Sequence, residues 1–342
     1  MKINLRLIFF SVFLFLLFSC SQNRPKYEQL LGTICVVNLY EDGKEEYYNE
    51  IFARLEEIDH EFGTDKMYSD ISRINARADV EPVTVGDDVF KVIETALKIC
   101  ELTDGAFDIS IEPAVNLWLI NSAAPHIATQ EEIDNILPLI DYKNIVLNPV
   151  NNSVYFRKEG MRIDLGGIAK GYAADEVAKI CRAHKIRRAV IDLGGNIYVY
   201  GKKKKNELWN VGIKNPEEPD NMPLLKVELP QTSVVTSGIY ERFFMRDEKF
   251  YHHILSPASG YPVDNELSSV TVICDNSMLA DGLTTAFFVM GAEKSVKLIP
   301  YIEKKFNTKI SALFFRKDKQ IVLSDNFSYE YTVLYDNWTV KS

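Results

Sequence analysis

The sequence lacks an apolar run long enough for a comfortable membrane-spanning helix, which needs roughly 20 residues. Its longest apolar segment, Leu7 to Phe18, is shorter than that and follows two cations, Lys2 and Arg6. A charged start, a short apolar core and small residues after it are typical of a secretory signal peptide. We therefore expect residues 1–19 to be a signal peptide that is removed on export.

The end of this segment, Leu17-Phe18-Ser19-Cys20, resembles a bacterial lipobox, in which a small residue precedes the cysteine that is lipidated. Two or more acyl chains on Cys20 would hold the protein stably at a membrane surface. Residues 20–28 would then form a polar tether. We expect an exported lipoprotein on the periplasmic side of a bacterial membrane; the alternative is an ordinary signal peptide with an incidental cysteine.

Cysteine is scarce, with five in the chain and no Cys-x-x-Cys pair. Cys35, Cys100 and Cys181 each lie in an apolar pattern, so we expect small buried side chains at these positions. An exported protein could instead pair the four cysteines that follow Cys20, and their spacing does not decide which pairs would form.

An excess of positive charge is also lacking, because the formal net charge is −9. This argues against nucleic acid as a partner. A phosphate-bearing ligand would therefore need local cations or a metal. No Gly-x-Gly-x-x-Gly follows a predicted strand, so a Rossmann-type nucleotide site is not indicated.

The order of the predicted elements indicates an α+β fold for residues 29–342. Apolar residues at helical spacing predict helices, and short β-branched runs bounded by turn residues predict strands. Hairpins and mixed order argue against a doubly wound parallel sheet. The predicted helices are 45–61, 87–103, 129–140, 277–291 and 292–304, with a polar loop at 63–75 and strands dominating from 188 onward.

A short repeat ends two apolar strands in paired glycines, at Asp164–Gly167 and at Asp192–Gly195. After the first copy, Ala169-Lys170-Gly171 leads into a helical pattern. Backbone N–H groups at a helix start favour anions, and Lys170 adds a full positive charge. This turn is a candidate pyrophosphate site; the alternative is a glycine turn with an incidental lysine.

One carboxylate, Asp281, lies in an otherwise apolar helical segment, Ser277 to Gly291. Helical spacing puts Asp281 and Thr285 on one face, with Thr284 beside them. A carboxylate in apolar surroundings must be paired, protonated or bound to a metal. With the hydroxyls it forms a set of hard oxygen donors suited to Mg²⁺ or Ca²⁺. For Asp281 taken alone, a structural role is the favoured interpretation, either as the cap of a neighbouring turn or as the partner of an arginine.

Two adjacent histidines, His252 and His253, end a predicted strand before a turn-rich segment. Alternation along the strand points one to each face, and either could serve as a general base near neutral pH. A fourth motif, Thr236–Phe244, is a turn that enters a strand with the charged residues Glu241 and Arg242, for which a salt bridge is the simplest interpretation.

These four motifs, in this order, resemble the ApbE family of FAD:protein FMN transferases. The resemblance covers roughly residues 31–325 and includes Asp164–Gly171, Thr236–Phe243, His253–Pro262, Met278–Thr285, Gly32-Thr33, Ser69–Asn75 and Gly105–Asp108. It implies a two-lobed, T-fold-like architecture of antiparallel sheets flanked by helices, with FAD in the cleft between the lobes.

The resemblance also implies roles for single residues. It implies that His253 activates the acceptor hydroxyl and that Lys170 screens the phosphates. The implied metal, Mg²⁺ or alternatively Ca²⁺, would contact Asp281, the backbone of Gly167, and Thr284 or Thr285. The implied FAD contacts are Leu31, Ala106, Phe107, Asp108, Asp164, Lys170 and Ile254.

Three positions depart from the family pattern. Asp65 stands where a flavin-stacking tyrosine is expected, which makes Tyr68 a shifted candidate. Ser256 and Asn196 each replace an aspartate.

The implied reaction transfers FMN from FAD to a threonine of an exported target with a Ser-Gly-Ala-Thr-like motif, releasing AMP. The alternatives are an FAD pyrophosphatase that uses water as the acceptor, and a flavin-binding lipoprotein without catalysis.

Overall fold

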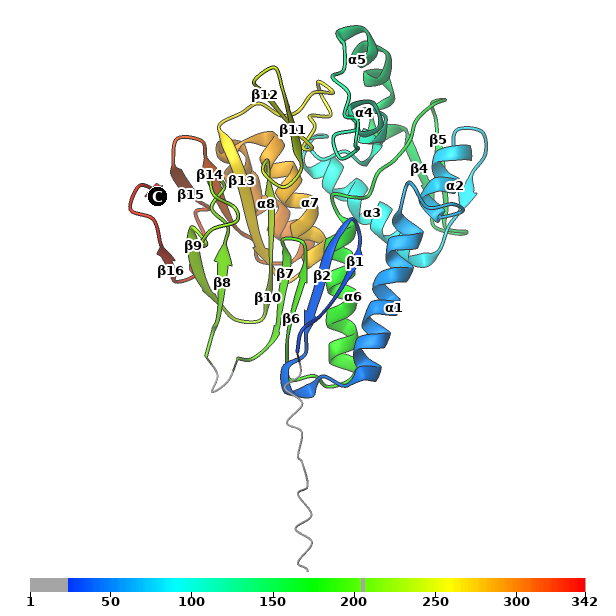
Figure 1. The fold of residues 1–342 in the computed structure, drawn as a ribbon. Coiled ribbons are helices and arrows are strands. Elements are labelled where there is room, and N and C mark those ends of the chain that lie inside the picture. Colours follow the sequence, from blue (N-terminus) through cyan, green and yellow to red (C-terminus); the bar gives the residue numbers. More distant parts are fainter. Residues whose placement is uncertain (1–23, 204–206, 342) are drawn as a thin grey trace, which may run out of the picture.

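A nine-stranded sheet runs through the centre of the molecule (Figure 1). The structure, a computed structural model, describes residues 24–203 and 207–341, so the predicted signal peptide 1–19 and Cys20 lie outside the described residues. Neighbouring strands are antiparallel, except that β15 and β17 run parallel. In spatial order the strands are β1 (Lys26–Leu30), β2 (Thr33–Asn38), β6 (Arg188–Leu193), β7 (Asn196–Gly201), β10 (Thr232–Gly238), β13 (Leu267–Cys274), β14 (Ser311–Arg316), β15 (Gln320–Leu323) and β17 (Thr339–Lys341).

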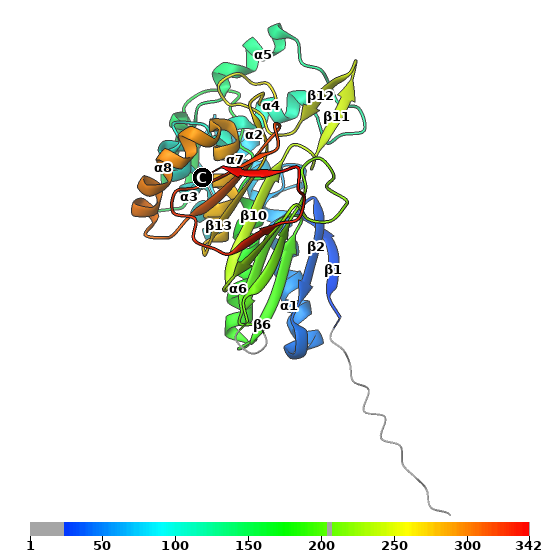
Figure 2. The same cartoon turned by 90° about the vertical axis from the view of Figure 1, so that its left-hand side faces the viewer.

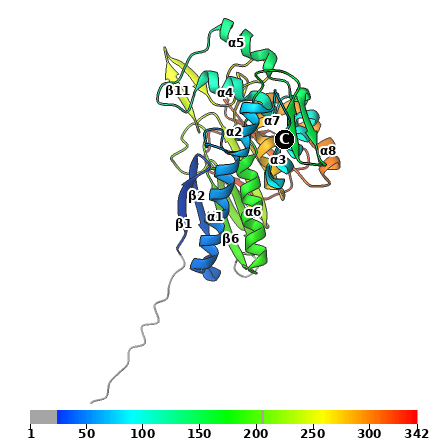
Figure 3. The same ribbon diagram turned by 90° about the vertical axis from the view of Figure 1, so that its right-hand side faces the viewer.

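Helices cover one face of this sheet (Figures 1 and 3). In α1 the apolar residues Ile51, Leu55, Ile58 and Phe62 are all buried, as their spacing predicts. α6 and α7 lie directly on the sheet, α1 packs on α6, and α3 and α8 pack on α7. The helices are α1 (Glu45–Phe62), α2 (Asp70–Arg77), α3 (Asp87–Leu102), α4 (Glu112–Trp118), α5 (Gln130–Ile136), α6 (Ala169–Ala183), α7 (Ser277–Met290) and α8 (Ala292–Phe306).

A small second sheet covers part of the other face (Figure 2). It consists of β8 (Trp209–Ile213), β9 (Leu225–Leu229) and β16 (Tyr331–Val333). β8 and β9 alternate buried and exposed residues, as expected for strands with one face on a core and one in solvent. In the central strand β10 the side chains divide accordingly, because Val234 joins this core and Val235 joins the core under the helices.

A cap of short elements lies at the end of the molecule farthest from the start of β1 (Figure 1). The hairpin β11 (Phe243–Arg246) and β12 (Lys249–His252) packs there against α4 and α5 around buried Trp118. The rings of Phe244 and Tyr251 stack at 4.9 Å, and Trp118 lies 5.6 Å from Tyr251. A further small sheet, β3 (Val83–Thr84), β4 (Ile145–Asn148) and β5 (Ser153–Phe156), completes the fold.

The α+β class and the antiparallel sheets flanked by helices are confirmed. Two local predictions are wrong. The expected loop 63–75 contains α2, which begins where the Ser69 hydroxyl accepts a hydrogen bond from Ser72 N at 2.9 Å. Residues 26–28, assigned to the tether, belong to β1 and pair with β2. Within the described residues, no helix has the length and apolar character needed to cross a membrane.

Candidate active site

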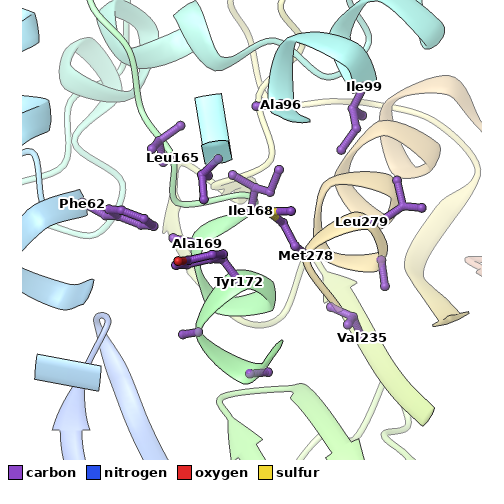
Figure 4. Close-up of a cluster of buried hydrophobic side chains, with 14 of the residues drawn as sticks. Phe62, Ala96, Ile99, Leu165, Ile168, Ala169, Tyr172, Val235, Met278 and Leu279 are labelled. Atoms are coloured by element: carbon purple, nitrogen blue, oxygen red, sulfur yellow. The ribbon is translucent and has the colours of Figure 1, made fainter. Parts of the chain in front are cut away.

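Helices α6 and α7 approach each other closely, and one glycine makes this possible. A Cβ atom on Gly171 would lie 2.2 Å from the Ser277 carbonyl oxygen and 2.7 Å from the Met278 Cα. Figure 4 shows Ile168 and Tyr172 near Met278 in the apolar cluster around this contact. The glycine therefore allows the first turns of two helices, and the side chains on them, to meet.

Asp281 is the acidic group at this contact, and only 3% of its surface is exposed. Its Oδ2 accepts a hydrogen bond from Gly171 N at 2.9 Å, and its Oδ1 lies 3.8 Å from Lys170 Nζ. Lys170 Nζ also donates to the Gly166 carbonyl oxygen at 3.1 Å. The fold thus joins the predicted phosphate-binding turn to the predicted metal-binding carboxylate, across 110 residues of sequence between Gly171 and Asp281.

The two threonines that follow Asp281 have different surroundings. Thr284 is fully buried, and its hydroxyl donates to the Asp281 carbonyl oxygen at 2.7 Å. Because that donation uses its only proton, Thr284 Oγ1 accepts from Ser237 Oγ, also at 2.7 Å. Thr285 is half-buried, and its hydroxyl makes no hydrogen bond within the described part of the chain. Of the two implied metal contacts, Thr285 is the one whose hydroxyl is uncommitted.

The Gly166–Gly167 turn lies opposite Thr285. The Asp164 carboxylate closes the turn by accepting a hydrogen bond from Gly166 N at 2.7 Å. Burial raises the pKa of Asp164, against the lowering effect of that bond and of nearby Lys170. A Cβ on Gly167 would lie 3.1 Å from the Phe107 ring and 3.5 Å from Thr285 Oγ1, so the bare backbone of Gly167 keeps this space free.

Asp108 holds the loop that carries Ala106 and Phe107. Its Oδ1 accepts hydrogen bonds from the backbone and hydroxyl of Ser110 at 2.8 and 2.6 Å, and its Oδ2 accepts from Tyr142 N at 3.0 Å. Burial raises the pKa of this carboxyl group. Both oxygens are occupied, so in this structure Asp108 positions Phe107 rather than presenting a free carboxylate to a ligand.

The turn between β1 and β2 brings Leu31 towards the hairpin. Leu31 and Gly32 both have positive φ, 53° and 67°, a conformation that is costly for leucine. Leu31 N donates to Asp59 Oδ1 at 2.8 Å, and Arg242 Nη2 donates to the Gly32 carbonyl oxygen at 3.1 Å. Within the described residues, the salt-bridge interpretation of this charged pair holds for Glu241 but not for Arg242: Glu241 Oε1 lies 3.9 Å from Lys214 Nζ.

The two histidines differ in how their ring nitrogens are used. His252 Nε2 donates to the Val263 carbonyl oxygen at 2.9 Å, and its Nδ1 accepts from the buried Ile254 N at 3.3 Å, so both nitrogens serve the fold. His253 Nδ1 lies 3.2 Å from the Arg242 carbonyl oxygen. A carbonyl can only accept, so Nδ1 carries the proton and Nε2 keeps the lone pair.

The environment of His253 favours its neutral form. Burial, with added repulsion from Arg242 and Lys170, lowers its pKa to about 3. Nε2 has no hydrogen-bond partner in the described residues, which leaves it available to take a proton. The uncommitted Nε2 of His253 selects it over His252 as the candidate general base, because both ring nitrogens of His252 are already hydrogen-bonded.

The donors around Asp281 suit a hard cation. No group of three or more His, Cys, Asp or Glu side chains that could hold a metal occurs in the described residues. The available donors are instead the Asp281 carboxylate, the Thr285 hydroxyl and the carbonyl groups of the Gly166–Gly167 turn. Such mixed oxygen donors fit Mg²⁺ or Ca²⁺, which bind oxygen and complete their shells with water or substrate phosphate.

The positions that depart from the family pattern are accommodated in different ways. Asn196 is fully buried and its Oδ1 accepts a hydrogen bond from Ser277 Oγ at 2.8 Å, which ties β7 to the start of α7. Ser256 N donates to the Tyr261 carbonyl oxygen at 2.8 Å within the turn after His253. Tyr68 is 78% exposed with φ 64°, and Asp65 is exposed nearby in the same loop.

Sequence reasoning missed one residue that builds the site. Asp175 on α6 accepts hydrogen bonds from Ser277 N and Met278 N at 3.0 and 2.9 Å, and so caps the start of α7. Burial raises the pKa of Asp175 to about 6. The sequence around Asp175 is an ordinary helical pattern. The one hint of its role is that an acidic residue lies on the same face of α6 as the buried Tyr172.

Comparison with known proteins of similar sequence and structure identifies the relatives of this chain. The model of the ApbE family matches residues 31–310. Two relatives named FAD:protein FMN transferase, from Klebsiella pneumoniae and Treponema pallidum, are 35% and 33% identical, each over 86% of this chain and over 90% and 84% of their own lengths. The ApbE protein of Thermotoga maritima superposes with a TM-score of 0.80 at 31% identity, covering 89% of this chain and 97% of its own. The flavin transferase ApbE of Vibrio cholerae gives 0.74 at 25% identity, covering 91% and 96%. This chain belongs to the ApbE family.

Proposed function

We propose that this protein is an FAD:protein FMN transferase that moves FMN from FAD onto a threonine hydroxyl of another protein and releases AMP. The observation that carries the proposal is the junction of α6 and α7. There a buried carboxylate, a lysine and a glycine turn lie together, which is a set suited to a pyrophosphate and a divalent cation. The relatives named for this activity support the same assignment.

The protein's own residues account for the steps of this reaction. Lys170 binds the phosphates and offsets their charge, so that an oxygen nucleophile can approach. The threonine oxygen attacks the FMN-side phosphorus, and the bond from that phosphorus to the AMP phosphate oxygen breaks. His253 Nε2 takes the hydroxyl proton, while the hydrogen bond from Nδ1 to the Arg242 carbonyl oxygen fixes the ring.

Asp281, Thr285 and the Gly167 backbone would hold Mg²⁺, with Ca²⁺ as the alternative. When bound, the ion would neutralise negative charge on the phosphates. The burial of Asp281 supports this role, because a buried carboxylate needs a cationic partner.

We also propose that lipidated Cys20 anchors the protein on the periplasmic side of a bacterial membrane, where its targets are exported proteins with a Ser-Gly-Ala-Thr-like motif. The lipobox-like sequence supports this. The position of β1 is consistent with it, because the described chain starts at the end of the molecule away from the α4–α5 cap (Figure 1).

A reconstituted reaction tests the function. Protein lacking residues 1–20, which retains every described element, is mixed with FAD, Mg²⁺ and a target domain bearing a Ser-Gly-Ala-Thr motif. Mass spectrometry follows covalent FMN on the target and chromatography follows AMP. A target with its threonine changed to valine is the control.

We expect modified target and an equal amount of AMP, with neither formed from the valine target. Free FMN and AMP with an unmodified target would indicate a pyrophosphatase instead. Intact FAD throughout would leave only flavin binding.

A further inference from the structure

Lys170 lies beside the Asp281 carboxylate and the Gly166–Gly167 turn, where a divalent cation would bind. Its Nζ lies 3.1 Å from the Gly166 carbonyl oxygen and 3.8 Å from Asp281 Oδ1. The Lys170 side chain is 23% exposed, whereas that of Asp281 is only 4% exposed. The ammonium therefore lies between a buried carboxylate and the open side of the site.

We propose that Lys170 is a resident counter-ion of Asp281 that competes with the divalent metal and must leave before the metal binds. The proposal rests on the proposed function, because it takes Asp281 and the Gly166–Gly167 turn as the metal's ligands. An ammonium 3.8 Å from Asp281 Oδ1 and a divalent cation bound to the same carboxylate would repel each other strongly, because the burial of Asp281 reduces dielectric screening. Binding of the metal then requires Lys170 to turn outward.

Lys170 already reaches the phosphate-binding turn, because its Nζ donates to the Gly166 carbonyl oxygen, and its side chain is partly exposed there. Lysine carries its charge on a flexible four-carbon stem, so it can change partners without movement of α6. A phosphate of FAD would offer the ammonium a new anionic partner and release Asp281 to the metal. Lys170 would thus make FAD and the metal favour each other's binding, and linkage requires that this effect be reciprocal.

The test measures metal affinity in the absence of FAD. Calorimetry with Mg²⁺ or Mn²⁺ compares the soluble protein with Lys170→Met, which keeps the length of the side chain but removes its charge. Lys170→Arg keeps the charge at the site. Lys179→Met removes one charge from the same helix at a residue that pairs with Glu176 and has no contact with Asp281.

We expect the Lys170→Met variant to bind the metal about tenfold more tightly than the parent, because the metal no longer has to displace the lysine from its partly buried ion pair with Asp281. Lys170→Arg and Lys179→Met should stay within about twofold of the parent, because each retains the local competing charge. FAD titrations, followed by flavin fluorescence, should show weaker binding for Lys170→Met. Opposite changes in metal and FAD affinity separate this role from a structural one, which would weaken both.

Two outcomes would overturn the proposal, and they can be told apart. Metal binding to the parent with unchanged or weaker binding to Lys170→Met would reject the competition but leave the metal site in place. Binding that survives Asp281→Asn, or no metal binding by any of the proteins, would reject the metal site itself and the competition with it. Thermal unfolding of each variant checks that it is folded.

Discussion

Replacing Gly171 by alanine should damage both stability and catalysis, because the added methyl group meets backbone. The new Cβ would lie 2.2 Å from the Ser277 carbonyl oxygen and 2.7 Å from the Met278 Cα. Ordinary contacts require α6 and α7 to separate by roughly 1 Å, since neither neighbour is a movable side-chain end. The same movement would stretch the hydrogen bond from Gly171 N to Asp281, now 2.9 Å.

The expected magnitudes follow from two opposing effects. Overpacking costs about 1–3 kcal/mol, and alanine in place of a helical glycine returns about 1 kcal/mol. A lost hydrogen bond to a buried carboxylate adds roughly 1–3 kcal/mol to the cost. We expect a net loss of about 2–3 kcal/mol in the free energy of unfolding. Displacing Asp281 by about 1 Å should slow FMN transfer on the order of a hundredfold.

Gly282→Ala is the matched control for this experiment. Gly282 is also helical and its Cβ would be close to another atom, 2.7 Å from Ile99 Cδ1, but that atom is the end of a flexible side chain. Urea unfolding should place Gly282→Ala within about 1 kcal/mol of the parent, because Ile99 can move aside, with transfer largely retained. If Gly171→Ala were as stable and active as Gly282→Ala, the close packing of α6 on α7 would not control the site.

Three other predictions follow from the site. Burial lowers the pKa of His253 from the usual 6.5 to about 3, so the stability that its neutral form contributes is present above pH 6.5 and is lost as the pH falls towards 3. In urea titrations, the His253→Gln variant should therefore lose less stability than the parent between pH 7 and pH 4. The same pH dependence in both proteins would show that His253 is not buried in its neutral form. Thr285→Val should reduce the rise in melting temperature caused by Mg²⁺ and change the melting temperature of the metal-free protein little. Thr284→Val should destabilise the protein with and without Mg²⁺, because it removes both hydrogen bonds of a buried hydroxyl. Equal behaviour of the two variants would contradict their separate roles. The four described cysteines are free and buried, and burial raises the pKa of each thiol. The folded protein should therefore react with dithionitrobenzoate only after it is unfolded, and rapid labelling of the native protein would contradict this.

The long periodic elements could be predicted from the sequence because their own apolar spacing specifies them. α1, α3, α7 and α8 start at or next to the predicted positions. The predicted helix 129–140 begins with the expected capping box of Thr129 and Glu132, but regular α-helix ends at Ile136 before a turn that contains Pro138. α2 was missed because it is short and polar, with only Ile71, Ile74 and Asn75 buried.

The composition of the site could be predicted, but not its internal arrangement. The motifs identified Lys170, Asp281 and His253, because their residue types carry chemistry wherever they lie. Separating Thr284 from Thr285 required the hydroxyl partner Ser237, which lies on another strand. The cap that Asp175 provides for α7 joins residues 102 positions apart, and no local pattern records such a contact.

The candidate site draws on residues far apart in the sequence, from Leu31 in the β1–β2 turn to Thr285 in α7. Synthesis proceeds from the N-terminus, and early segments can begin to fold before later ones exist. A chain that has not yet produced α7 has no Asp281, and α6 has no partner for Gly171. The candidate site is therefore complete only after α7 has been made and has packed on α6, and a chain that ends before α7 lacks it. In this family member the contact that joins α6 to α7 also completes the candidate ligand site, so FAD binding would report that these two helices have packed together.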